Sequence, residues 1–374
     1  WLFFVEHKKP SGVWIMAYTT IDDPSAYFQT ALYTGNGGTL AVTNDGNSDM
    51  QPDWVWAKSR TQANSHVFFD VVRTFAGDKE IQSNNTGAEG ASDSAGYGYI
   101  SAVGSDGFTA KAGTTAGDYT NVSSQNYVAW QWKAGTSFSN DASSTSVGSI
   151  DSSGSTSTTA GFSIVKIDSM PAGTTSTFAH NLGVKPDFII FKSRNLATNW
   201  DVYNSSALPD GERKFYLNDT DAVIDSGFMN DTAPTSSVVS FNPGSNDSNH
   251  IAYCFAEKKG YSKFSSYTGN GNADGTFVYT GFKPAWVLIK WVGGTSDWYI
   301  YDNKINPFNV MSKVFAPNIA NAEITTSRLM DFTSNGFKNR GSGNTTNASG
   351  ENYIYMAFAE NPFVTSTGVP ATAR

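Results

Sequence analysis

The sequence predicts an all-β fold made of three tandem homologous β-sandwich repeats, jelly-roll-like and of roughly 100 residues each. Two observations point to this class. A block of paired apolar segments occurs three times along the chain with constant internal spacing. Charged residues make up only 16% of the chain and aromatic residues 14%, while Gly, Ser, Thr and Asn fill much of the remainder. This composition is typical of many short strands joined by turns.

The internal repeat fixes the architecture of the predicted fold. In each copy a proline opens an apolar segment that ends in a lysine, at 52–58, 186–192 and 284–290. A second segment follows at the same distance in every copy. It opens on a ring-bearing residue and ends in Asp or Asn, at 66–70, 200–204 and 298–302. Each pair of segments predicts a β-hairpin.

Both faces of the first strand are apolar, as expected for a central strand between two layers. Trp54 and Trp56 lie on one face, and Val55 and Ala57 lie on the other. The opening proline lacks an N–H, so it is tolerated at the first residue of a strand and not within it. For the recurring lysines we expect the stem to cover apolar surface and the ammonium to reach water, with a catalytic or ligand-binding role as the alternative. They are Lys58, Lys192 and Lys290.

Further strands complete each repeat. The sequence Tyr-Thr-Gly-Asn-Gly at 33–37 and again at 267–271 predicts tight turns, and Asn-Gly is a strong hairpin signal because both central residues of a type I′ turn need positive φ. A Gly-Phe pair opens a later strand in every copy, and an apolar strand closes each copy at 127–132, 250–255 and 353–358. Roughly six or seven strands per repeat match the density of a β-sandwich.

Composition shifts divide the chain. The predicted organisation is an N-terminal arm at 1–27, repeat 1 at 28–134, a Ser/Thr/Gly-rich linker at 135–160, repeat 2 at 161–259, repeat 3 at 260–360 and a C-terminal tail at 361–374. The linker composition predicts a flexible or weakly paired connector. Residues 1–15 match nothing in the repeats, so Met16 is a candidate natural start and the residues before it a candidate extension or arm.

Charge and cysteine usage exclude several classes of partner. The formal net charge is −8, and no Lys/Arg-rich run occurs, so we expect no nucleic acid and no anionic membrane as partner. No apolar run approaches the roughly 20 residues that span a bilayer, so we expect no membrane insertion. Cys254 is the single cysteine, which rules out an intrachain disulfide and a Cys-pair zinc site.

No catalytic set is found, so we expect no catalytic residues, no cofactor and no metal site. Phosphate loops, Gly-x-Ser-x-Gly and His-Glu-x-x-His are absent from the sequence. The four histidines, His7, His66, His180 and His250, are scattered, and two of them stand where other copies carry aromatic rings. One acidic or amide position occurs in all copies, as Asp70, Asn204 and Asp302. Because one copy has an amide, we predict a strand-end hydrogen bond and not a general acid. Paired carboxylates far apart in the chain remain an alternative.

The loop inside each hairpin is the candidate ligand-binding surface. Its residues of interest are Arg60, Arg194 and Trp291. Arginine can hold carboxylates or hydroxyls, and an exposed indole can stack on a sugar ring. The alternative is a solvated loop whose Trp291 still belongs to the sheet.

Several segments resemble one protein family. They are 16–22, the two Tyr-Thr-Gly-Asn-Gly turns, 51–56, 256–257, 260–264 and 369–374. Together they resemble repeat-bearing structural proteins of marine tailed phages such as cyanophages, which are tail-fibre-like and largely unassigned in function. The resemblance covers residues 16–374. It implies a protein made in the host cytoplasm and assembled onto a virion, with other virion proteins as partners and a homo-oligomer, a trimer by analogy with fibres.

The leading hypothesis is therefore a non-enzymatic phage virion protein, a tail fibre or appendage for host attachment that contacts a surface glycan or protein. A capsid or tail decoration or assembly protein is the alternative. A polysaccharide depolymerase on the same scaffold is the second alternative, because fold alone does not decide function.

Overall fold

The computed structural model describes residues 6–8, 14–75, 78–115, 119–244 and 247–372. Strands account for 41% of the chain and helices for 3%, so the predicted all-β class is confirmed. The candidate extension at 1–15 lies largely outside the described residues. Within it the structure places β1 (Glu6–Lys8), which pairs with β2 (Trp14–Met16).

Residues 28–132 form a first unit of two facing sheets. Its strands make one sheet in the order β3-β10-β5-β6-β7 and a smaller one in the order β4-β9-β8. They are β3 (Phe28–Thr34), β4 (Thr39–Val42), β5 (Trp54–Ser59), β6 (Val67–Asp70), β7 (Ile81–Gln82), β8 (Tyr99–Val103), β9 (Phe108–Lys111) and β10 (Asn126–Trp132). Two short helices accompany them, η1 (Pro24–Ala26) and α1 (Ser94–Tyr97).

Residues 162–255 form a second unit. Its large sheet contains the order β13-β20-β15-β16-β17-β18, and β14 pairs with β19 in a small sheet. The strands are β13 (Phe162–Ile167), β14 (Ser176–Ala179), β15 (Phe188–Ser193), β16 (Asp201–Asn204), β17 (Arg213–Tyr216), β18 (Ile224–Asp225), β19 (Val238–Phe241) and β20 (His250–Phe255).

Residues 262–362 form a third unit, with sheets β21-β28-β23-β24 and β22-β27-β26-β25. The strands are β21 (Ser262–Thr268), β22 (Phe277–Tyr279), β23 (Phe282–Trp291), β24 (Tyr299–Asp302), β25 (Met311–Val314), β26 (Ile324–Thr333), β27 (Gly336–Asn339) and β28 (Asn352–Pro362). The first and third units thus hold eight strands each among the described residues, slightly more than the sequence predicts, and the large sheet of the second unit continues into two further strands of the segment 135–160.

The three large sheets share one plan. The closing strand lies between the opening strand and the first strand of the repeated block, so β10 pairs with β3 and β5, β20 with β13 and β15, and β28 with β21 and β23. The predicted hairpins of the block are present as β5-β6, β15-β16 and β23-β24. Every pairing is antiparallel.

The segment predicted to be a flexible linker is ordered instead. It forms β11 (Thr136–Asn140), α2 (Ala142–Thr145) and β12 (Ser152–Ser157), and β12 pairs with both β11 and β13. Of the two alternatives, the flexible connector was wrong, because backbone hydrogen bonds join these strands to the sheet of the second unit and the few apolar side chains, Phe138 and Ile150, pack against the core. Small residues help this packing, since a Cβ at Gly154 would overlap the carbonyl of Ile164.

Two local predictions need correction. The Asn-Gly turns do not close hairpins, because β3 and β4 belong to different sheets, as do β21 and β22. Only the final glycines, Gly37 and Gly271, have positive φ, so the type I′ geometry is not met and each turn is a corner between two sheets. Pro284 lies inside β23, not at its start, and two register shifts beside it accommodate the missing N–H.

In the first and third units the block strand buries one face in its own unit and the other face between units. Val55 and Ala57 pack with the small sheet of the first unit, and Val287 and Ile289 pack likewise in the third. The opposite face, with Trp54 and its counterparts, points to a central core shared by all three units. The aromatic residues of the block strands therefore do not fill a separate core in each unit.

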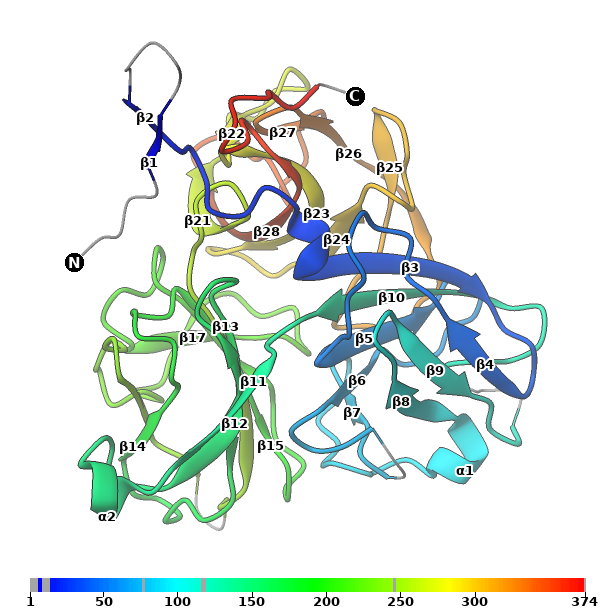
Figure 1. The fold of residues 1–374 in the computed structure, drawn as a ribbon. Helices are drawn as coiled ribbons and strands as arrows, with labels where there is room; N and C mark the ends of the chain where they lie inside the picture. Colours follow the sequence, from blue (N-terminus) through cyan, green and yellow to red (C-terminus); the bar gives the residue numbers. More distant parts are fainter. Residues whose placement is uncertain (1–5, 9–13, 76–77, 116–118, 245–246, 373–374) are drawn as a thin grey trace.

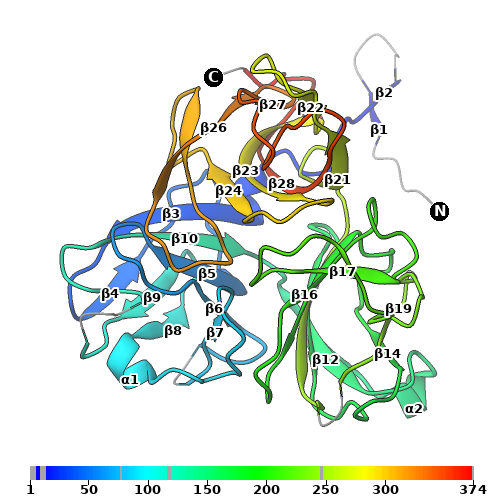
Figure 2. The ribbon, with the colours of Figure 1, turned by 180° about the vertical axis from the view of Figure 1, so that it is seen from behind.

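Aromatic rings from three units meet in this central core. Trp54 of the first unit stacks on Tyr253 of the second at 4.5 Å between centroids. Trp132 of the first unit meets Trp286 of the third edge to face at 5.8 Å, and Phe255 of the second meets Phe358 of the third at 6.0 Å. Figures 1 and 2 show the units as three lobes that meet in the middle of the molecule.

The two ends of the described chain lie together on the third unit. The Tyr18 hydroxyl donates to the carbonyl of Gly281 at 2.8 Å, and its ring packs edge to face on Phe363. The Asp22 carboxylate accepts the backbone N–H of Ser366 at 2.6 Å. The predicted arm and tail are therefore attached to one another through side chains.

A shared core makes the three units unfold together. We expect Trp286→Ala to lower the free energy of unfolding by about 3–5 kcal/mol and to shift one cooperative transition, measured by urea unfolding with fluorescence and near-ultraviolet circular dichroism. The control is Ile289→Val, on the other face of the same strand, with a cost of about 0.5–1.5 kcal/mol. Separate transitions, only one of which responds to Trp286→Ala, would contradict a shared core.

Candidate functional site

The recurring lysines are buried and bind backbone carbonyls. Lys192 Nζ donates to the carbonyl of Thr86 in the first unit at 3.1 Å, and Lys290 Nζ donates to that of Thr220 in the second unit at 2.7 Å. Lys58 donates to two carbonyls of its own loop. All three side chains are at most 1% exposed. The expectation that the ammonium reaches water was wrong, because carbonyl oxygens replace water as acceptors.

The ring-bearing residue of each block also contacts the neighbouring unit. Trp200 Nε1 donates to the last carbonyl of β7 in the first unit at 2.9 Å, and Trp298 Nε1 donates to the last carbonyl of β17 in the second unit at 2.9 Å. His66, at the same position, packs edge to face on Phe315 of the third unit. The contacts run from second to first, third to second and first to third, so the units form a closed ring.

The Asp/Asn position adds polar contacts between units. Asp70 and Asp302 each accept two backbone N–H groups of the turn that follows, which confirms the predicted strand-end hydrogen bond. The second oxygen of Asp70 accepts the Tyr253 hydroxyl of the second unit at 2.8 Å. The second oxygen of Asp302 accepts Trp130 Nε1 of the first unit at 3.0 Å.

The amide copy of this position fits its different neighbour. Asn204 also caps the following turn, accepting two backbone N–H groups. The closing strand of the third unit carries Met356 where the other closing strands carry Tyr253 and Trp130, and methionine has no donor for a carboxylate. A buried carboxylate without a donor is costly, so an amide avoids a buried charge here, although Asn204 Nδ2 is buried without a hydrogen-bond partner among the described residues.

A further pair of positions lies at each contact between units. In every pair the backbone N–H of the second residue donates to the carbonyl of the first at 3.0 Å. Two of the pairs add an Arg–Glu ion pair with N···O distances of 2.7 Å, and the third pair is aliphatic. The pairs are Arg60 with Glu323, Arg194 with Glu89, and Val292 with Val223.

The three candidate loop residues, Arg60, Arg194 and Trp291, all form contacts within the chain. Arg60 and Arg194 face glutamates of the neighbouring unit, and Trp291 Nε1 donates to the Glu351 carboxylate of its own unit at 2.9 Å. Internal contacts therefore account for all three side chains without a ligand. Ligand binding by these side chains stays a prediction, and the loop around Arg194 leads to a different feature.

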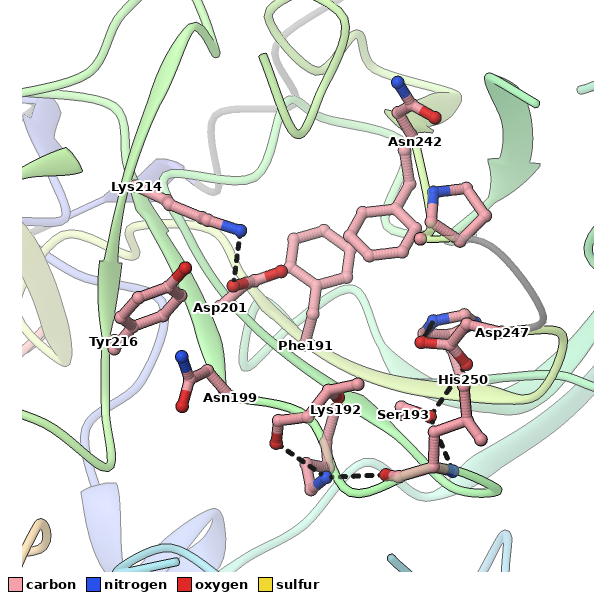
Figure 3. A pocket seen from close by; sticks show the side chains of 15 residues that line it. Phe191, Lys192, Ser193, Asn199, Asp201, Lys214, Tyr216, Asn242, Asp247 and His250 are labelled. Atoms are coloured by element: carbon pink, nitrogen blue, oxygen red, sulfur yellow. Dashed lines mark hydrogen bonds and ion pairs between the residues drawn. The ribbon is translucent and has the colours of Figure 1, made fainter. Parts of the chain in front are cut away.

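That feature is a cavity of about 310 Å³ at one end of the second unit, shown in Figure 3. It lies between β15, β16 and β17 on one side and the segment from β19 to β20 on the other. Its polar wall contains Lys192, Ser193, Asn199, Asp201, Lys214, Tyr216, Asn242, Asp247 and His250, and its apolar wall contains Phe191, Leu196, Phe241 and Pro243. A pocket of this size suits a small ligand.

The cavity exists because the second unit departs from the other two at core positions. In the second unit His250 pairs with Ile167 across the two strands. At the same place Tyr127 stacks on Tyr33 at 5.2 Å between ring centroids in the first unit, and Tyr353 stacks on Tyr267 at 5.1 Å in the third. In the first unit the Tyr33 hydroxyl donates to the carbonyl of Thr120, and this hydrogen bond holds the segment that precedes β10 against the corresponding end of the unit. Without the tyrosine pair, the end of the second unit stays open.

A charged pair also replaces apolar residues there. Asp201 stands where the other units have Val67 and Tyr299, both buried in their unit cores. Its carboxylate forms an ion pair with Lys214 Nζ at 2.9 Å, and burial raises the pKa of Asp201 while the nearby ammonium of Lys214 partly offsets this. Burial lowers the pKa of Lys192 to about 8.

Part of the polar wall is already engaged. The Ser193 hydroxyl donates to one oxygen of Asp247 at 2.7 Å, and His250 Nε2 lies 3.1 Å from the other oxygen. Serine, aspartate and histidine thus occur in that order, with the carboxylate in the middle. A hydrolase needs the histidine against the serine, so this arrangement does not activate Ser193 as a nucleophile.

Other polar groups of the wall have no protein partner. Within the described residues no hydrogen bond reaches buried His250 Nδ1, and none is formed by the Tyr216 hydroxyl or the Asn242 side chain. Of these groups only His250 Nδ1 is buried, and a buried polar atom is usually paired, so it is consistent with a contact to a ligand or to water; Tyr216 is half-buried and Asn242 is exposed, so water can reach both.

The remaining sequence candidates are structural. His66 is fully buried and accepts a hydrogen bond from Trp56 Nε1 at 2.9 Å, and burial together with the nearby Lys58 lowers its pKa. Cys254 is fully buried, and burial raises the pKa of its thiol. In the described part of the chain no group of three His, Cys, Asp or Glu side chains is placed to hold a metal, and no helix is long and apolar enough to cross a membrane.

Sequence reasoning missed most of the pocket residues. It named Lys192 and His250, for other roles, but Asp201, Lys214 and Asn242 were not singled out. A signal was present, since Asp201 is the one charged residue at a block position that is apolar in the other two copies. Lys214 and Asn242 carried no comparable signal, because their segments diverge among the units.

Fold and contacts define an all-β protein in which three two-sheet units close around one aromatic core, with a polar pocket in the second unit. The chain belongs to the family described as Domain of unknown function (DUF7483), which it matches over residues 23–362. The match runs through all three units, as expected for units that share a core. No curated protein and no solved structure matches the chain.

The three equivalent pairs at the contacts between units predict a compensating substitution. We expect Glu323→Val alone to lower the free energy of unfolding by about 1–3 kcal/mol, because it leaves Arg60 half-buried without its carboxylate. Adding Arg60→Val recreates the aliphatic pair of Val292 and Val223 and should restore most of the loss in urea unfolding. Additive losses in the double variant would contradict this equivalence.

The buried lysines predict a rise of stability with pH. Burial lowers the pKa of Lys58 to about 7 and those of Lys192 and Lys290 to about 8, against about 10.4 for lysine in an unfolded chain. Between these values the unfolded chain binds protons that the folded chain does not, so the free energy of unfolding increases with pH. Buried tyrosines such as Tyr253, whose pKa burial raises, reverse the trend above about pH 10.

Substitution of a single lysine tests whether the buried lysines cause the increase of the free energy of unfolding with pH. Urea unfolding across this range should show a smaller rise for Lys58→Met, by up to about 1.4 kcal/mol per pH unit. The control, Lys263→Met, removes a surface lysine that is 27% exposed and should leave the slope unchanged. Equal slopes for both variants would show that Lys58 keeps its proton throughout the range.

Proposed function

We propose that the protein is a non-enzymatic structural protein of a phage virion, a tail-fibre-like or appendage component for host attachment. The observation that carries this proposal is the use of the recurrent polar positions. The buried lysines, the Asp/Asn position and the Arg–Glu pairs all serve contacts within and between units. A set of units joined in this way is suited to holding loops in fixed positions. In this proposal the repeated ionisable groups are structural and take no part in a reaction.

Other properties agree with this role. The net charge of −8 favours solubility of a component made in many copies in the host cytoplasm and assembled afterwards. Its resemblance to phage structural proteins supplies the virion context. Partners would be other virion proteins and a glycan or protein of the host surface. The three-part core is complete within one chain, so a trimer would add contacts outside this core.

Purified particles and free protein together test the proposal. We expect peptides of this chain in purified virions by mass spectrometry, antibody labelling at the tail or at a vertex, and slower adsorption when free protein is added to host cells. Labelling over the whole shell in stoichiometric amount would instead indicate a decoration protein. Release of reducing sugar from host envelope would indicate a depolymerase, and absence from particles would overturn the proposal.

A further inference from the structure

We propose that the pocket of the second unit binds one neutral sugar ring, held by Asp201, Lys214 and Asn242. The inference rests on the proposed attachment function only for the source of the sugar, since the binding chemistry follows from the pocket itself. The cavity of about 310 Å³ lies in the size range of small-molecule sites.

The charges of the wall select a neutral ligand. Asp201 is paired with Lys214 at 2.9 Å, and Asp247 lies 3.1 Å from His250 Nε2. An anion would meet two carboxylates, and a cation would meet Lys214 and the ammonium of Lys192. A hydroxyl group both donates and accepts, so neighbouring hydroxyls of a sugar can donate to Asp201 and accept from Lys214 without disturbing the ion pair.

The other walls fit the remaining faces of a pyranose. Asn242 is an exposed residue of the pocket lining, and its amide can donate to one oxygen of a ligand and accept from another. Tyr216 and Phe241 supply aromatic surface beside these polar groups. Apolar rings with a few convergent polar groups are the usual composition of a small-molecule site. Figure 3 shows Lys214 and Asp201 facing each other, with Tyr216 beside them and Asn242 across the cavity.

Comparison with the other units separates a binding role from a structural one. The same strand position carries Val67 in the first unit and Tyr299 in the third, so the frame folds with an apolar residue there. A buried ion pair is often no more stabilising than apolar residues of similar size. The pair of Asp201 and Lys214 is therefore not needed to hold the sheet together.

The test uses the full chain and saturation-transfer NMR with titration calorimetry. The probes are methyl glycosides of glucose, galactose, mannose and N-acetylglucosamine, with glucuronate, glucosamine and inorganic phosphate as charged alternatives. We expect at least one neutral glycoside to bind more tightly than every charged probe. Asp201→Asn and Asn242→Ala should each weaken it about tenfold, the loss of one hydrogen bond of about 1.4 kcal/mol. The matched control is Asp274→Asn, which breaks an exposed ion pair with Lys338 in the third unit.

A second variant guards against loss of folding. Asp201→Val combined with Lys214→Met should abolish sugar binding while thermal stability stays equal to that of the unchanged protein or rises. Sugar binding that survives both Asp201 variants, or binding of only a charged probe or of none, overturns the proposal. Because these measurements need no virus particle, their failure leaves the attachment function standing, and absence of the chain from particles leaves the sugar site standing.

Discussion

The alternation of side chains along the block strands is the constraint on which the rest of the structure depends. Period two sends Trp54 and Trp56 toward the centre of the molecule and Val55 and Ala57 into the first unit. A shift by one residue would exchange the two sets and place indoles where only small side chains fit. The shared core and the separate cores of the first and third units are therefore specified by alternate residues of the same strands.

Closing three units into a ring buries polar backbone groups as well as aromatic rings. At each contact, residues at equivalent positions form hydrogen bonds with groups of the neighbouring unit or pack against it. Where the neighbouring closing strand offers a donor, as Tyr253 and Trp130 do, the block ends in aspartate. Where that strand offers Met356, it ends in asparagine. The Arg–Glu pairs and the pair of valines show the same dependence, since charge appears on both sides of a contact or on neither.

The sequence was sufficient for the fold class, the hairpins of the block and the strand-end role of Asp70. These depend on short-range spacing, which a single chain displays directly. It was insufficient for the core shared between units, because two apolar faces predict two buried layers without saying which unit supplies each. It also failed for 135–160, where main-chain pairing with β13 orders a segment poor in apolar residues. The burial of the lysine ammonium groups could not be predicted either, because the carbonyls that accept their hydrogen bonds, such as that of Thr86, are distant in sequence.

The same constraint bears on where a pocket can arise in the second unit. Substitutions on the inner face of a block strand disturb all three units at once, whereas Asp201 stands at a position whose counterparts, Val67 and Tyr299, pack in the cores of their own units. Variation at such a position costs the least stability, yet the partly buried ion pair of Asp201 and Lys214 gains little stability over the Val67 of the first unit. Positions that break a local rule without a structural gain are where function is expected in a folded chain. The contacts and the core that the three units share make the structure rigid. The pocket of the second unit, where its residues differ from those of the other two, is where binding specificity is expected.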